Sequence, residues 1–159
     1  MRHRTWTTLL LLLLGGIIAL PLIPEASAQA DRLDWAARIA EMDRALARGE
    51  TATLTAVWRE AYVAAHVGRG WPGMLAVGDA ALRAGRATGT PEVFEPRARR
   101  AYLTALLRAR RQASRDGVLA AGEAFGRLGD RDAERLAKSE AAKLAIRAEA
   151  DARRRARAL

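Results

Sequence analysis

The chain lacks cysteine and asparagine altogether and has only two histidines. Without cysteine it can form no disulfide bond, no thiol nucleophile and no cysteine metal site. Beyond residue 30, His66 is the single histidine, and no H-E-x-x-H or similar ligand spacing surrounds it. We therefore expect no metal site and no cofactor, and we interpret His66 as a helix-end residue whose ring favours the helix dipole.

Sequence motifs of catalysis are missing as well. Ser114 and Ser139 lack the G-x-S-x-G context of a nucleophilic serine, and Gly68-Arg69-Gly70 begins neither a P-loop nor a dinucleotide-binding loop. Acidic pairs such as Glu41 and Asp43 are typical of solvated helix surfaces, although paired carboxylates can act as acid and base. We expect no catalytic residue and no small-molecule substrate, and we predict that the protein is not an enzyme.

Aromatic residues make up only 5% of the chain, and β-branched residues are sparse beside Ala, Leu, Arg and Glu. Because the abundant residues are strong helix formers, the composition predicts an all-α fold. Residues 31–150 are enough for one domain with a single hydrophobic core.

The first thirty residues have the order of a secretory signal peptide. A cationic start, Met1–Arg4, precedes an apolar run, Leu9–Ile23, and small residues follow at Ala28 and Ala30. We predict that residues 1–30 are a signal peptide cleaved after Ala30. Arg outnumbers Lys 25 to 2, as GC-rich bacterial coding produces, so we expect a protein exported to the bacterial periplasm or to the outside of the cell.

An uncleaved membrane anchor is the alternative for this segment. Its apolar run of fifteen residues is shorter than the roughly 20 that a membrane-spanning helix needs. Pro21 and Pro24 are expected to interrupt a helix there. Both features favour cleavage over anchoring.

The excess of positive over negative charge lies wholly in the second half of the mature chain. Residues 31–95 carry eight Arg against nine acidic residues, whereas residues 96–159 carry fifteen Arg and two Lys against eight. An excess of this kind indicates an anionic partner for the second half, although it also keeps an exported protein soluble.

Apolar periodicity and glycine or proline punctuation predict six helices. They are expected over about Leu33–Arg48, from a Thr51 or Thr53 cap to Gly68, over Pro72–Ala84 with Gly85 closing it, over Arg97–Ser114 after a polar connection from Arg86 to Pro96, over Val118–Leu128 behind an Asp116 cap, and from Arg131 to the C-terminus. The basic segment 151–159 is expected to be a solvated, frayed tail.

An internal repeat indicates how these helices pair. The segment Gly73–Ala80 is echoed 44 residues later by Gly117–Ala124, and Gly85 is matched by Gly129 at the same distance. The dipeptide Ala61-Tyr62 recurs 40 residues later as Ala101-Tyr102. Repeats of this length predict about three antiparallel helical hairpins, as an α-solenoid or a compact bundle. Chance similarity in an Ala- and Gly-rich helical chain is the alternative.

The second copy resembles a tetratricopeptide-type hairpin. It reads Gly122-x-x-Phe125-x-x-x-Gly129-Asp130, with Ala141 on the following helix. The resemblance is degenerate, because Ala81 replaces the aromatic residue in the first copy, Glu134 stands where a small residue is expected, and the closing proline is absent. It covers about residues 51–148 and implies a scaffold that binds proteins.

Arginines gather on one face of the helix predicted over Arg97–Ser114. At roughly 100° per residue, five arginines share an arc of about 80° with Thr104. They are Arg97, Arg100, Arg108, Arg111 and Arg115. Like charges three or four positions apart repel, and no acidic residue of the same helix lies among them.

Guanidinium groups bind carboxylates and phosphates, so this face predicts an anionic partner. An acidic protein, anionic lipid or an anionic envelope polymer fits an exported protein, whereas export argues against nucleic acid. The alternative is a face that is solvated or paired with acids of neighbouring helices. The acids available for such pairing are Glu123, Asp130, Asp132 and Glu134.

Trp71 stands between Gly70 and Pro72 at a helix entrance, whereas Trp35 and Trp58 lie on apolar stripes and are expected in the core. Trp71 either staples the turn or lies exposed as a contact residue. The sequence thus predicts a non-catalytic interaction module with a protein partner. The alternative is a peripheral binder of anionic envelope components through the Arg-rich face.

Overall fold

The computed structural model describes residues 23–158, with side chains from Asp34 onward. Most of the predicted signal peptide therefore lies outside the described residues. The elements are α1 (Ile23–Ala47), the short 3-10 helix η1 (Thr51–Thr53), α2 (Leu54–Val67), α3 (Trp71–Thr88), α4 (Pro91–Arg111), α5 (Arg115–Arg127) and α6 (Arg131–Arg157). Residues 23–158 form no strand, and the predicted all-α class is confirmed.

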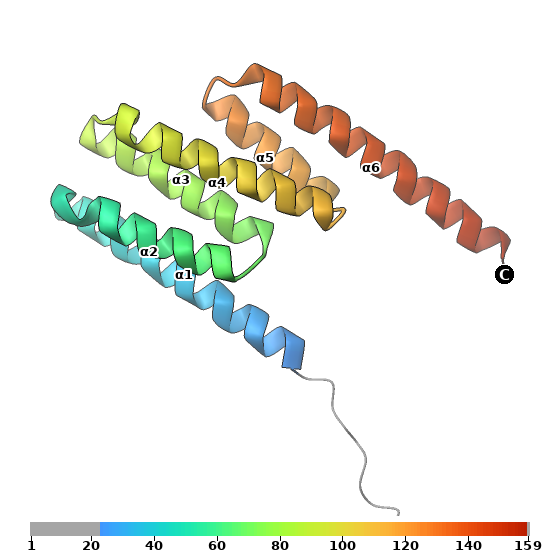
Figure 1. Cartoon of the computed structure of the whole chain (residues 1–159), viewed down its shortest axis with the longest axis horizontal. Helices are drawn as coiled ribbons and strands as arrows, with labels where there is room; N and C mark the ends of the chain where they lie inside the picture. Colours follow the sequence, from blue (N-terminus) through green and yellow to red (C-terminus); the bar gives the residue numbers. More distant parts are fainter. Residues whose placement is uncertain (1–22, 159) are drawn as a thin grey trace, which may run out of the picture.

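The six α-helices form three antiparallel hairpins, α1–α2, α3–α4 and α5–α6, stacked in chain order (Figure 1). The first helices of the hairpins make one layer, because α3 packs on both α1 and α5. The second layer consists of α2, α4 and α6, which pack on the first layer rather than on one another. Since only neighbouring hairpins pack extensively, the arrangement is an open stack and not a closed bundle.

Glycines allow the two helices of a hairpin to approach closely. In the middle hairpin, a Cβ atom at Gly78 would overlap the ring of Tyr102, with Cδ1 only 2.6 Å away. In the last hairpin, a Cβ atom at Gly122 would lie 2.7 Å from the methyl group of Ala137. These are the glycines of the sequence repeat, and they occupy equivalent places in their hairpins.

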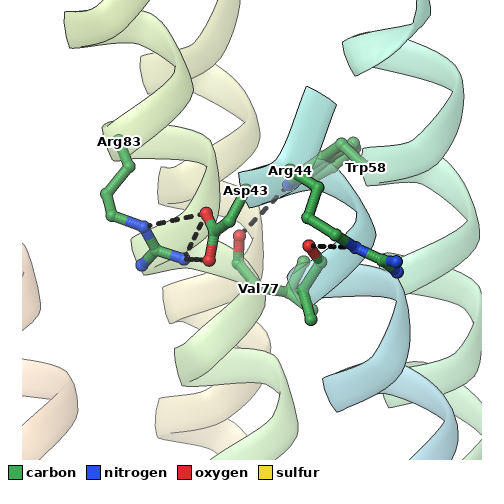
Figure 2. A network of polar contacts seen from close by, with 6 residues as sticks. Asp43, Arg44, Trp58, Val77 and Arg83 are labelled. Carbon is green, nitrogen blue, oxygen red and sulfur yellow. Dashed lines mark hydrogen bonds and ion pairs between the residues drawn. The ribbon is translucent and has the colours of Figure 1, made fainter. Parts of the chain in front are cut away.

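A buried hydrogen bond and an exposed ion pair join the first hairpin to the second. The indole Nε1 of Trp58 on α2 donates to the carbonyl of Val77 on α3 at 3.1 Å, and Arg83 of α3 binds both carboxylate oxygens of Asp43 on α1 (Figure 2). The burial of Trp58 confirms its predicted place in the core. Trp35 packs against the core from α1, also as predicted.

A second polar cluster ties the middle hairpin to the last. The hydroxyl of Tyr102 donates to Asp79 at 2.6 Å, and Arg127 of α5 donates to the same carboxylate at 2.5 Å. Burial and the neighbouring Asp79 carboxylate both raise the pKa of the Tyr102 hydroxyl. The phenol therefore stays protonated and acts as a donor that fixes α4 against α3.

The prediction that Gly85 ends the third helix is wrong. Gly85 lies inside α3, buried against Phe94 of α4, and the left-handed turn falls at Gly89, with φ of 67°. The fourth helix likewise begins at Pro91, so the predicted polar connection is mostly helical. Pro96 is tolerated inside α4 because Pro96 and Glu92, its lost hydrogen-bond partner, both lie on the exposed side.

Two further helix ends differ from the prediction. Helix α1 is described from Ile23, ahead of the predicted start at Leu33, so Pro24 lies within it and does not interrupt it. The cap of α5 is Ser114, whose Oγ accepts from the Gly117 N–H, and Asp116 lies inside the first turn. Ala113, with φ of 50°, makes the reversal between α4 and α5.

Helix α6 is the longest element and extends past α5 (Figure 1). It buries only Ala137 and Ala141, whereas its Leu136 is 57% exposed. The helix continues to Arg157, and residues 151–158 are all exposed.

Candidate functional site

The five arginines predicted to share one face have different surroundings in the structure, and only Arg108 and Arg111 line the same hollow. Arg108 is the only buried charged side chain among the described residues, at 6% exposure. Its guanidinium donates to the carbonyls of Ala65 at 2.9 Å, His66 at 2.8 Å and Gly70 at 3.1 Å. These carbonyls lie at the end of α2 and in the turn that leads into α3. Arg108 therefore supplies hydrogen-bond donors to carbonyls that have no partner within the helix. The prediction of an outward-facing Arg108 is therefore wrong.

Three more arginines of the predicted face have different surroundings. Arg97 is half-buried, with its guanidinium 5.3 Å from the ring centre of Phe94 and 5.8 Å from that of Trp58. Arg115 is the first residue of α5 and lies beyond the chain reversal, so its predicted place on the fourth helix is wrong. Arg100 is exposed on α4, as predicted.

Trp71 has a structural role at the entrance of α3. A Cβ atom at Gly117 of α5 would lie 2.7 Å from the indole of Trp71, so the ring packs onto the glycine backbone. This partly buried contact matches the staple interpretation, and it joins the middle hairpin to the last.

Arg108 and Arg111 lie beside the end of α2, around a hollow of about 680 Å³. The hollow lies where α2 and α4 end, and we call it the basic hollow. It is lined by His66, Val67, Arg69, Arg108, Arg111 and Gln112. Burial and then the charge of Arg111 lower the pKa of Arg108.

A second hollow, of about 300 Å³, separates α4 from α6, and we call it the α4–α6 groove. It is lined by Leu107, Arg110, Arg111, Glu140, Leu144 and Arg147. Leu107 is 46% exposed. Leu107 and Leu144, one from each helix, give the groove its apolar part, which we call the floor. Arg110, Arg111 and Arg147 give it its cationic part, which we call the rim. Arg111 lines both the groove and the basic hollow.

The single carboxylate of the α4–α6 groove is already paired. Glu140 accepts from Lys143 at 2.8 Å and lies 3.3 Å from Arg110 across the groove. The hydrogen bond from Lys143 and the charges of Arg110 and Arg147 lower the pKa of Glu140. The groove therefore keeps a net positive charge, with three arginines against one carboxylate.

Several residues of these hollows are absent from the sequence-based prediction. Arg69 follows a helix end and belongs to no periodic face, so its place beside Arg111 arises only from packing. Leu107, Leu144 and Arg147 come together only because α4 and α6 lie on either side of the groove.

The chemistry available at these hollows is binding by charge and apolar contact. Within residues 23–158, no three His, Cys, Asp or Glu side chains come together as a metal site requires. No helix in the described part of the chain combines the length and apolarity needed to span a bilayer. Comparison with models of protein families, with curated proteins and with solved structures finds no match for this chain. Its function therefore has to be argued from the geometry of the hairpin stack.

Proposed function

We propose that the protein is a non-catalytic interaction module that binds an acidic, amphipathic helix of a partner protein in the α4–α6 groove. The observation that carries this proposal is the pairing of an apolar floor, Leu107 and Leu144, with a cationic rim, Arg110, Arg111 and Arg147. Neighbouring helices that face each other with leucines normally close together and bury them. Here α4 packs on α3 and α5 instead, so the leucines remain available.

Charge complementarity selects the kind of partner. A helix whose apolar face lies on the two leucines would present its flanking residues to the arginine rim. Carboxylates at those flanks would pair with guanidinium groups, whereas lysines would be repelled. The stack of three hairpins and the close approaches at Gly78 and Gly122 are compatible with the tetratricopeptide-like scaffold proposed from the sequence.

We place this activity in the bacterial periplasm or cell envelope, on the strength of the order of residues 1–30. Cleavage after Ala30 would leave in place the α1 residues that contact α2 and α3, including Trp35, Arg38 and Asp43. The hairpin stack is thus compatible with removal of the N-terminal segment.

The experiment is a titration of the protein with a synthetic amphipathic helical peptide whose polar face is rich in Glu. Leu107→Asp should weaken binding by about tenfold or more, because it removes apolar contact and adds a repelling charge. Leu103→Asp is the matched control, since Leu103 lies one turn away at 49% exposure and does not line the groove. A Lys-rich version of the peptide should bind far more weakly. Equal loss in both variants, or equal binding of both peptides, would contradict the proposal.

A second candidate function is favoured by the end of α6. Arg153, Arg154, Arg155 and Arg157 are all exposed on a helix that extends past the stack. Such a cationic extension suits adsorption to anionic lipid or an anionic envelope polymer. Replacing these four arginines by Gln should abolish sedimentation with anionic vesicles and leave the peptide titration unchanged. Vesicle binding that survives the replacement would exclude this second function.

A further inference from the structure

The basic hollow combines three guanidinium groups with no opposing carboxylate in its wall. Arg69 comes from the turn after α2, whereas Arg108 and Arg111 come from the last turns of α4. Among the described residues, no carboxylate lies within ion-pair distance of Arg69 or Arg111, although fourteen ion pairs connect charges elsewhere. The hollow is therefore an unneutralised cationic site, unlike the α4–α6 groove with its paired Glu140.

The fold holds one of these guanidinium groups and the turn that carries a second. Three carbonyls hold the guanidinium of Arg108. A guanidinium has five N–H donors, and Arg108 uses three on protein carbonyls, so two remain. Gln112 of α4 donates to the carbonyl of Arg69 at 3.2 Å and holds the turn, in which Arg69 has a left-handed φ of 49°. Arg108 and the backbone of Arg69 are thus held in place before any ligand arrives, which lowers the entropic cost of binding.

We propose that the basic hollow binds a ligand that carries a phosphomonoester group. A phosphomonoester has a charge of about −1.5 to −2 near pH 7 and three terminal oxygens. Three guanidinium groups around one hollow match three oxygens and a double negative charge, whereas one planar carboxylate offers two oxygens and one charge. This site is independent of the proposed partner groove except at Arg111, which lines both.

The size of the hollow indicates that the ligand is larger than inorganic phosphate. A volume of about 680 Å³ lies within the usual range of small-molecule sites. Val67, 65% exposed, supplies an apolar wall, and the exposed ring of His66 supplies a further polar group. The organic part of the ligand would lie against Val67. A soluble phosphate ester and the headgroup of phosphatidic acid both present this chemistry.

The test is calorimetric titration of the full chain with phenyl phosphate, with phthalate as a matched aromatic dicarboxylate. Phenyl phosphate should bind saturably and more tightly than phthalate. Arg69→Gln should weaken phenyl phosphate binding by about tenfold or more, since it removes charge-assisted hydrogen bonds. Arg100→Gln is the matched control, an exposed arginine that does not line the hollow, and it should change the affinity less than about twofold.

Parallel sedimentation with vesicles containing phosphatidic acid distinguishes the two sources of the phosphate group. Arg69-dependent binding to phenyl phosphate alone identifies a soluble ester, and Arg69-dependent binding to the vesicles identifies a lipid headgroup. Equal affinity for phthalate, equal loss in Arg69→Gln and Arg100→Gln, or binding to none of the probes would overturn the proposal. Because Arg69 does not line the α4–α6 groove, its variant should bind the acidic peptide normally, so failure of this site is distinguishable from failure of the partner groove.

Discussion

The middle and last hairpins are built on the same close glycine contact but differ in what surrounds it. In the middle hairpin, α4 buries large side chains, including Phe94 and Tyr102, and is covered by α3 and α5. In the last hairpin, α6 buries only Ala137 and Ala141 and packs mainly on α5. A small-residue contact holds α6 in place without closing it onto α4, and this leaves the α4–α6 groove open.

This difference predicts which substitutions will lower the stability of the whole domain and which will have only local effects. In a stack of hairpins, stability depends on contacts between neighbours, and a terminal element has a neighbour on one side only. We therefore expect substitutions around α4 to affect the free energy of unfolding of the whole domain. Substitutions around α6 should act locally.

The largest loss of stability is expected from Arg108→Met. The substitution removes three hydrogen bonds from a charged donor and leaves the carbonyls of Ala65, His66 and Gly70 without that donor. We expect the free energy of unfolding to fall by about 3 kcal/mol. Urea unfolding followed by circular dichroism would measure it. The exposed Arg100→Met is the control, and a comparable loss there would show that the effect does not depend on burial.

A smaller loss is expected from Gly78→Ala, and a smaller one again from Gly122→Ala. The new methyl group at Gly78 would meet the ring of Tyr102, which its hydrogen bond to Asp79 holds in place. Overpacking should outweigh the gain in helix propensity and cost about 2 kcal/mol. At Gly122 the methyl meets Ala137, and α6 can shift outward, so we expect about 1 kcal/mol. Thermal unfolding of both variants measures these losses. A larger loss of stability in Gly122→Ala than in Gly78→Ala would contradict the expected order.

Acid should loosen the last hairpin before the middle one. The backbone N–H of Ala133 and then Arg99 lower the pKa of Asp130, and Lys138 and Arg131 lower that of Glu134. Because the folded pKa values lie below the ordinary values of 3.8 and 4.5, these carboxylates stabilise the fold above those values. That stability is lost as the pH falls through the lower folded values.

Amide hydrogen exchange as a function of pH would measure this order. Protection of α6 should fall at a higher pH than protection of α4, and Asp130→Asn should reduce the difference. Simultaneous loss of protection in both helices would mean that the two hairpins titrate as one unit.

The smallest effect is expected from Arg110→Ala. The ion pair between Arg110 and Glu140 spans the groove at 3.3 Å, but the Arg110 side chain is 48% exposed. Exposed pairs contribute about 0.2–1 kcal/mol, so the midpoint of urea unfolding should barely move. A loss as large as that of Arg108→Met would show that α6 is closed onto α4 in solution.

The sequence was sufficient for the fold class and for the number of helices. Helical periodicity identified the core position of Trp58, and the helix predicted over Leu33–Arg48 ends at Ala47, close to the left-handed Gly49. The predicted helix boundaries were wrong where one residue type can serve two structural roles. Gly85 reads as a helix end, yet its lack of a side chain serves the approach of Phe94.

The site could be predicted only in part. Periodicity places Arg108 and Arg111 near one another on α4, but it contains no information about the carbonyls at the end of α2 that bury one of them. The partnership of Arg69 with Arg111 joins residues 42 positions apart on different hairpins. Such contacts depend on the relative positions of the hairpins, which no local pattern specifies.

Binding of an acidic amphipathic helix between α4 and α6 is tested most directly by amide hydrogen exchange of the protein with and without the Glu-rich peptide. Such binding should give new protection over residues 103–111 and 140–147 and leave exchange in α1 and α2 unchanged. Protection confined to residues 151–158, or to the layer of α1, α3 and α5, would contradict it.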